Sequence, residues 1–214
     1  MSYIIGMDNW EIAMSVMVGV GLSAACGFRV FIPPLVLCVA GKAGHMTFGA
    51  DFSWMDSNFA LVAFALATAL EIGAYYIPWL DNALDTIAAP AAVVAGTLTS
   101  ASVFGGDMSP WLKWSLAAIA GGGAAGAVQM TTTVARGTSS ALTGGTGNWI
   151  VSTGEAVGAT IIAVLALVVP VLVFFGLVML AGYIVYRNPL KMLRQWRARN
   201  ETEEPASEPN VMAV

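Results

Sequence analysis

The chain has 214 residues, of which 57% are hydrophobic and only 10% are charged, and its mean hydropathy is +0.75. Because a soluble domain usually carries about 25% charged residues, this composition excludes an ordinary soluble domain and predicts an all-α integral membrane protein. The formal net charge of -4 says little about partners, because four of the thirteen acidic residues lie in the polar tail, and nucleic acid is not implied. We expect a multi-pass protein of the inner (plasma) membrane.

The first apolar segment, residues 10–40, is longer than the roughly 20 residues that cross a bilayer core. It places Arg29 after a run of small residues, and Pro33 and Pro34 follow. Proline lacks a backbone N–H and disfavours helical geometry in the residue before it, so we expect a break or kink just after Arg29. Irregular backbone at membrane depth is tolerated only inside protein or along a wet cavity. No basic residue precedes Arg29, so the segment is not expected to be a cleaved signal peptide.

The second apolar segment is residues 58–77, which follow a polar stretch, 41–57, expected to form a surface loop. This segment is apolar apart from Thr68 and Glu71. It ends at an aromatic cluster, 75–79, of the kind that lies at the headgroup interface. We therefore expect a membrane-spanning helix that carries one buried acid.

The third apolar segment, 86–104, is expected after a short turn at 81–85, and it contains Pro90. The fourth segment begins at Pro110 and passes through a glycine-rich run. Small residues allow helices to approach closely, so a set of glycines is expected to pack against other helices. That set consists of Gly21, Gly27, Gly122 and Gly126, of which the last two make a GxxxG face.

Residues 131–147 are rich in threonine, serine and glycine, with Arg136 in the middle. We expect a broken or re-entrant stretch there. The fifth segment, 149–186, is too long for one perpendicular span, and Pro170 is expected to kink or divide it.

The polytopic membrane domain is expected to cover residues 1–187. Residues 188–199 are basic and amphipathic, which predicts a helix on an anionic leaflet, and 200–214 predict a disordered acidic tail. Five of the nine basic residues lie at 187–199, which places the C-terminus in the cytoplasm. Five spans would then place the N-terminus outside and Lys42 inside. Six spans, with the first or fifth segment divided, are the alternative.

The two halves of the membrane domain share landmarks that predict an inverted repeat of 10–105 and 110–187. An offset of 100 sets residues 21–29 on 121–129, and an offset of 80 sets Pro90 on Pro170. Chance recurrence of small residues is the other explanation. Inverted repeats with broken helices are the arrangement in which transporters place a site near the midplane.

Several motifs together resemble a bacterial membrane family catalogued as domain of unknown function 4126. They are Gly27-Phe28-Arg29 with proline following, Glu71, Ile77-Pro78-Trp79-Leu80-Asp81, Asp85, the glycine/threonine run, Gly147-Asn148, Ser152 and Glu155. The resemblance covers nearly the whole apolar region and implies a multi-span membrane protein with no established activity. The chain departs from the family pattern at Ala156, where many members have aspartate, and at Ala89, where many have arginine.

Charged residues are rare inside membranes and usually face a bundle interior or a wet cavity. An unpaired guanidinium in hydrocarbon costs several kcal/mol, so Arg29 is expected to be held by Glu71, Glu155 or both. Either these residues are a structural ion pair, or they form a substrate or proton pathway. Gln129 and Arg136 are candidates for the same pathway, with an interfacial anchor as the alternative for Arg136.

No cofactor or metal site is predicted. Cys26 and Cys38 lie in apolar sequence without CxxC spacing, and His45 stands alone in a polar loop. A GxGxxA pattern at 19–24 matches a dinucleotide fingerprint, but no βαβ unit surrounds it, so helix packing explains it better.

The sequence favours a small transporter or channel-like permease for a small or anionic solute. In this interpretation Arg29 attracts the anion or holds a gate, while Glu71 and Glu155 balance its charge or carry protons. The alternative is an accessory or scaffold protein that packs through its small-residue faces. No enzymatic activity is expected, because nucleophile–base and metal-ligand clusters are missing from the sequence. The expected partners are the lipid bilayer and a small solute or ion, with no nucleic acid; a homo-oligomer is compatible with the pattern.

Overall fold

The computed structural model describes residues 9–104 and 108–187. Over these residues the chain forms eight α-helices and no strand, which confirms the all-α fold. The chain divides into two compact units, residues 1–174 and 175–214. The predicted basic segment at 188–199 and the predicted acidic tail lie outside the described residues.

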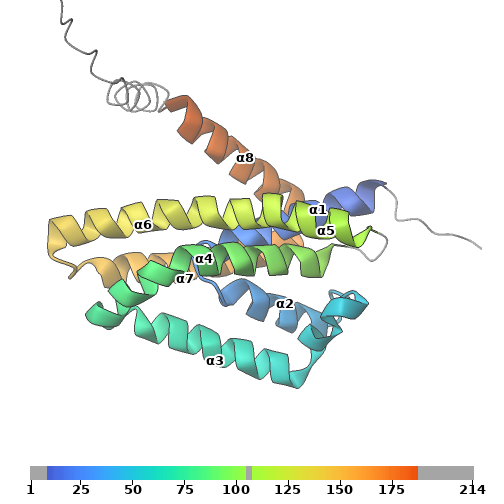
Figure 1. Cartoon of the computed structure of the whole chain (residues 1–214), viewed down its shortest axis with the longest axis horizontal. Coiled ribbons are helices and arrows are strands. Elements are labelled where there is room, and N and C mark those ends of the chain that lie inside the picture. The colour runs from blue at the N-terminus through green and yellow to red at the C-terminus, as the bar shows by residue number, and fades with distance from the viewer. Residues whose placement is uncertain (1–8, 105–107, 188–214) are drawn as a thin grey trace, which may run out of the picture. The chain divides into compact units, whose positions relative to one another are not determined.

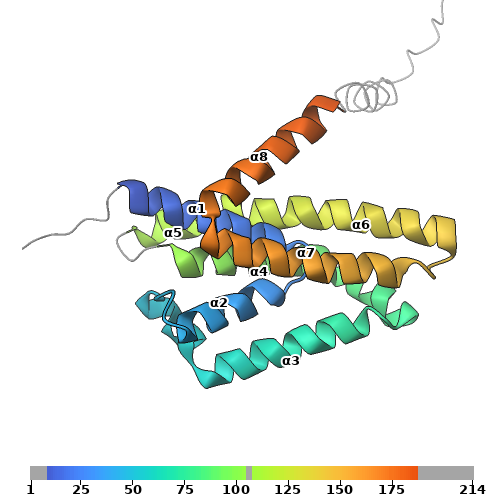
Figure 2. The same cartoon turned by 180° about the vertical axis from the view of Figure 1, so that it is seen from behind.

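The first apolar segment is a broken helix that folds back on itself. Helix α1 (Asn9–Cys26) ends before Arg29, and α2 (Ile32–Lys42) begins after it, with the two prolines in its first turn. The predicted break near Arg29 is confirmed. However, the start of α1 and the end of α2 lie at the same end of the first unit (Figures 1 and 2). The fold-back differs from the single crossing of the five-span prediction and corresponds to the alternative in which the first segment is divided.

The polar stretch after α2 is more ordered than a surface loop. It contains a 3₁₀ helix, η1 (Ala50–Asp56), whose Phe52 and Met55 are buried. Helix α3 (Asn58–Ala74) follows at an angle of 68°. The hydroxyl of Ser57 accepts a hydrogen bond from the backbone N–H of Ala60 and so caps the start of α3.

Helix α4 (Pro78–Val103) begins earlier than the sequence pattern indicated. Residues 81–85 lie inside it, so the short turn predicted there is wrong. Ile77 has extended backbone, as expected before a proline, and Pro78 suits the first helical turn. Pro90 lies within the helix without ending it.

A long helical run follows, made of α5 (Pro110–Leu116), a π-helical stretch η2 (Ala117–Gly122) and α6 (Gly123–Thr143). The irregular stretch predicted at 131–147 is therefore wrong as far as Thr143. Threonine hydroxyls in α6 donate to carbonyl oxygens one turn earlier, as Thr138 does to Val134 at 2.9 Å, so they are satisfied within the helix. The helix ends at Gly144, whose φ of 63° suits glycine.

The long run packs closely against α4 through small residues. A Cβ added at Gly96 would lie 2.6 Å from the Cβ of Ala125, and one added at Gly122 would lie 2.6 Å from Thr97 Oγ1. A Cβ added at Gly126 would lie 3.1 Å from Val93. The Gly122/Gly126 face is thus turned toward α4 within the chain.

Helix α1 lies between the other helices of the first unit and packs against α4, α6 and α7. A Cβ at Gly21 would lie 2.8 Å from the Cβ of Ala166, and one at Gly27 would collide with the backbone of α6. Ser23 donates to the carbonyl oxygen of Gly96 at 2.6 Å. Small side chains therefore bring the backbone break beside α6 and α7.

The fifth apolar segment is divided at Pro170, as predicted, into α7 (Asn148–Val168) and α8 (Pro170–Arg187). Among the described helices, two are long and apolar enough to cross a bilayer, Thr86–Val103 and Asn148–Val168, or three if the bent pair of η1 and α3 is one span. Many large apolar side chains are exposed on the described helices, such as Phe59 and Ile119. This surface suits contact with lipid.

Candidate functional site

Arg29 lies in the break between α1 and α2, and only 1% of its surface is exposed. Its Nη2 donates to the carbonyl oxygen and to the hydroxyl of Ser152, at 2.8 and 2.5 Å. The same nitrogen lies 3.3 Å from Glu155 Oε2. Both partners belong to α7, so the prediction that Glu155 holds Arg29 is confirmed.

A second buried arginine reaches the same carboxylate. Arg136, on α6, donates from Nε to Glu155 Oε1 at 3.0 Å and pairs through Nη2 with Oε2. Arg136 is 3% exposed and Glu155 is 5% exposed. Arg136 is therefore part of the buried charge cluster and not an interfacial anchor.

The Arg136–Glu155 pair was missed because residues 131–147 were expected to be irregular. The spacing of the two residues from the turn between α6 and α7 did indicate the pair. Arg136 lies eight residues before Gly144 (144 - 136 = 8), and Glu155 lies eight residues after Gly147 (155 - 147 = 8). Antiparallel helices joined by a short turn bring such positions to the same level.

Tyr75 is the aromatic member of the cluster. The guanidinium carbons of Arg29 and Arg136 each lie 4.0 Å from the centroid of its ring. A cation over an aromatic face is attracted by the ring quadrupole, and the attraction strengthens when water is excluded. Sequence analysis placed Tyr75 at the headgroup interface, but the end of α3 turns its ring into the buried cluster.

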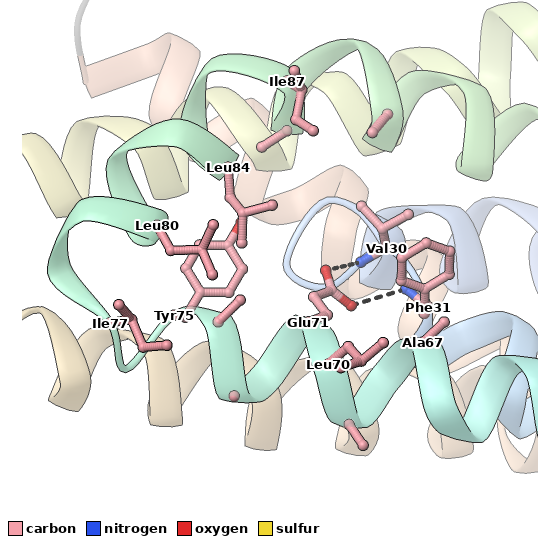
Figure 3. A pocket seen from close by; sticks show the side chains of 15 residues that line it. Val30, Phe31, Ala67, Leu70, Glu71, Tyr75, Ile77, Leu80, Leu84 and Ile87 are labelled. Carbon is pink, nitrogen blue, oxygen red and sulfur yellow. Dashed lines mark hydrogen bonds between the residues drawn. The ribbon is translucent and has the colours of Figure 1, made fainter.

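Glu71 does not contact Arg29 among the described interactions. Its Oε1 accepts from the backbone N–H of Val30 at 2.8 Å, and its Oε2 accepts from that of Phe31 at 3.1 Å (Figure 3). These two N–H groups precede α2, whose N-cap position has no side-chain cap. Of the two acidic partners predicted for Arg29, the structure thus supplies Glu155 and not Glu71. Glu71 instead satisfies the backbone at the break.

A cavity of about 780 Å³ lies beside Glu71, between α3, α4 and the break (Figure 3). Its walls are mostly apolar and include Leu80, Leu84 and Ile87. Tyr75 lines this cavity and also contacts the two arginines. The tyrosine ring therefore lies at the boundary between the cavity and the charge cluster.

Gln129 is buried on α6, but its described side-chain contact stays within that helix. Its side-chain Nε2 lies 3.4 Å from the hydroxyl of Thr133. Its backbone carbonyl oxygen accepts a hydrogen bond from the hydroxyl of Thr132. The structure thus brings Arg29, Arg136 and Glu155 together and does not join Gln129 to them.

The charges of the site balance only as a set. Two arginines face Glu155, and Glu71 is close enough to both arginines to interact with them electrostatically. The formal charges of these four residues sum to zero when both glutamates are ionised. Even so, Nε and Nη1 of Arg29 have no hydrogen-bond partner within the described part of the chain. A buried guanidinium with unused donors can accept a further anionic or polar ligand.

The described residues contain no group of three or more histidine, cysteine or acidic side chains that could hold a metal ion. A family model described as "Domain of unknown function (DUF4126)" matches residues 16–188. Neither the curated proteins nor the solved structures include a significant match to the chain.

Proposed function

The chain belongs to the DUF4126 family, and we propose that it is a small membrane permease for an anionic solute. One observation carries the proposal. Arg29 is buried at a break in an apolar helix, and two of its three guanidinium nitrogens have no hydrogen-bond partner in the described structure. Its Nη2 already meets Glu155, but leaving two buried donors unused inside a membrane domain is costly unless a ligand uses them.

The break supports the same function. Transporters place substrate sites between discontinuous helices, where irregular backbone is tolerated beside a cavity. Here α1 and α2 form a re-entrant pair whose turn lies part-way along the neighbouring helices (Figures 1 and 2). Helix α3, helix α4, the α5–α6 run and α7 alternate in direction around it, and we take them as the crossings. Helix α8 is a further, shorter apolar helix, and we take the C-terminus as cytoplasmic.

Glu155 acts as an internal competitor for the solute. A bidentate hold on a guanidinium uses two neighbouring nitrogens, and each pair of neighbours on Arg29 includes Nη2. That nitrogen is occupied by Ser152 and Glu155. A solute that binds both nitrogens of a pair must displace Glu155 from Arg29, and Glu155 keeps its two contacts with Arg136. Each arginine then keeps one anionic partner while the solute is bound.

The face at Gly122 and Gly126 no longer supports the scaffold alternative, whereas Gly154 and Gly158 on α7 have open space around them. That alternative relied on small-residue faces that are free to pack against other proteins. Gly96 and Gly122 are occupied in the contact between α4 and the α5–α6 run.

The test is anion flux into liposomes that contain the purified protein. Chloride, nitrate and formate would be compared, with empty liposomes as the baseline. Arg29→Met is expected to abolish the flux that the wild type shows. Lys113→Met is the matched control, because Lys113 is also buried and paired, with Asp51, but lies away from the cluster. Flux equal to that of empty liposomes for all three anions, or flux unchanged in Arg29→Met, would contradict the proposal.

A further inference from the structure

The contacts of Glu71 suggest which kind of anion the protein carries. We infer that the cavity beside Glu71 binds an amphiphilic monocarboxylate, whose carboxylate replaces that of Glu71 on the N–H groups of Val30 and Phe31. The hydrocarbon part of the ligand lies in the cavity, and Glu71 takes up one proton when it is displaced. This inference rests on the proposed function: it adds a second position for the same solute, at the break next to Arg29, and so names the substrate class.

The backbone at the break is already shaped for a carboxylate. Two consecutive N–H groups each bind one oxygen of the same planar group, at 2.8 and 3.1 Å. They lie at the start of an 11-residue helix, where the backbone dipoles favour negative charge. A planar ligand with two equivalent oxygens reproduces both contacts of Glu71 at once. Glu71 therefore occupies a site that an external carboxylate fits equally well.

The cavity has room for the hydrocarbon part of the ligand. Val30, Phe31 and Glu71 line one side of it, and apolar side chains of α3 and α4 line the rest (Figure 3). Its volume of about 780 Å³ lies within the range of about 300–1,000 Å³ that is typical of small-molecule sites. A carboxylate on the two N–H groups would have its alkyl chain against Leu84 and Ile87.

Charge balance requires the proton. The described ionisable groups around Glu71 are the arginines Arg29 and Arg136, the acid Glu155, and two groups that are neutral when protonated, Tyr75 on α3 and Cys26 on α1. With both glutamates ionised their formal sum is zero, so an added carboxylate brings the site to one negative charge. A proton on Glu71 restores neutrality. An ammonium ligand does not fit this site. To pair with it, Glu71 would have to give up its two N–H donors, and the ammonium group would lie close to two arginines.

The test is octanoate binding to the full-length protein in nanodiscs of zwitterionic lipid, with empty nanodiscs subtracted. Titration calorimetry in two buffers of different ionisation enthalpy gives the number of protons taken up. We expect about one proton per octanoate and an affinity that falls about tenfold per pH unit where Glu71 is ionised. Glu71→Gln should bind octanoate without proton uptake and without this pH dependence.

Two further variants test the cavity without changing any charge. Leu84→Trp fills it and should weaken octanoate binding at least tenfold. Leu66→Trp is the control, because Leu66 is exposed on α3 and does not line the cavity. Equal binding in both tryptophan variants would overturn the inference.

Other outcomes separate this inference from the proposed function. If octylammonium binds in place of octanoate, or if Glu71→Gln still takes up a proton, the inference is wrong. If formate or chloride binds through Arg29 and octanoate does not bind, the inference fails and the permease stands. If no anion binds at all, both fail.

Discussion

Arg29 and Arg136 reach the same carboxylate oxygen, Oε2 of Glu155, from a backbone break and from a continuous helix. Both guanidinium carbons also lie 4.0 Å from the centroid of the Tyr75 ring. Two like charges are therefore held together by one acid and one aromatic ring. This arrangement makes Glu155 the residue on which the cluster depends most.

Glu155→Gln is predicted to destabilise the protein more than Arg29→Met or Arg136→Met. Removing Glu155 leaves two buried cations, whereas removing either arginine leaves one intact pair, and breaking a buried pair typically costs about 3–5 kcal/mol. Unfolding of each purified variant in detergent measures the difference. Adding both methionine changes to Glu155→Gln should recover part of the loss. Strictly additive effects would show that the three residues are not coupled.

Tyr75→Leu is predicted to destabilise the cluster, and Tyr75→Phe should cost less because it keeps the ring. A desolvated cation–π contact contributes about 2 kcal/mol or less, and Tyr75 makes two such contacts. The free energy of unfolding of the two variants gives the comparison. If leucine and phenylalanine at this position were equivalent, the ring would not stabilise the arginines.

Gly122→Leu is predicted to lower the yield and the stability of folded protein. A Cβ at Gly122 already lies 2.6 Å from Thr97 Oγ1, and overpacking of this kind typically costs about 1–3 kcal/mol. Gly123→Leu is the matched control, because a Cβ at Gly123 meets nothing within 4 Å. Thermal unfolding of the two variants side by side tests the contact. Similar behaviour would mean that α4 and the long run do not pack as described.

The fold-back of the first segment gives a topology prediction. Cysteines placed at Trp10 and at Ser53 should react with an impermeant thiol reagent from the same side of the membrane. The native Cys26 and Cys38 are buried and should stay unreactive. Labelling of the two positions from opposite sides would restore a single crossing for the first segment.

The sequence predicted the features that follow from local chemistry. Pro33 and Pro34 indicated the break, Pro170 indicated the division between α7 and α8, and the cost of a lone buried cation indicated an acidic partner for Arg29. Each of these depends on a residue whose backbone or charge permits few alternatives.

The errors have a common physical origin, because they depend on tertiary placement. A threonine-rich segment can form a helix when its hydroxyls donate to carbonyl oxygens one turn earlier, as Thr138 does. Whether it forms a helix or an irregular stretch then depends on how it packs against the other helices. Whether α2 continues the direction of α1 or reverses it is set by contacts with distant helices. Glu71 accepts hydrogen bonds from backbone N–H groups at the break. Matching acidic with basic residues along the sequence could not reveal these backbone partners.

Anion binding at Arg29 tests the central claim most directly. The unfolding temperature of the detergent-solubilised protein would be measured against rising formate and chloride at constant ionic strength. The wild type and Lys113→Met should be stabilised by one of these anions, by an amount that rises with the logarithm of its concentration above the dissociation constant and reaches about 2.7 kcal/mol at 100 times that constant. Arg29→Met should show no such stabilisation. Equal stabilisation of Arg29→Met, or none in the wild type with either anion, would contradict an anion site at the broken helix.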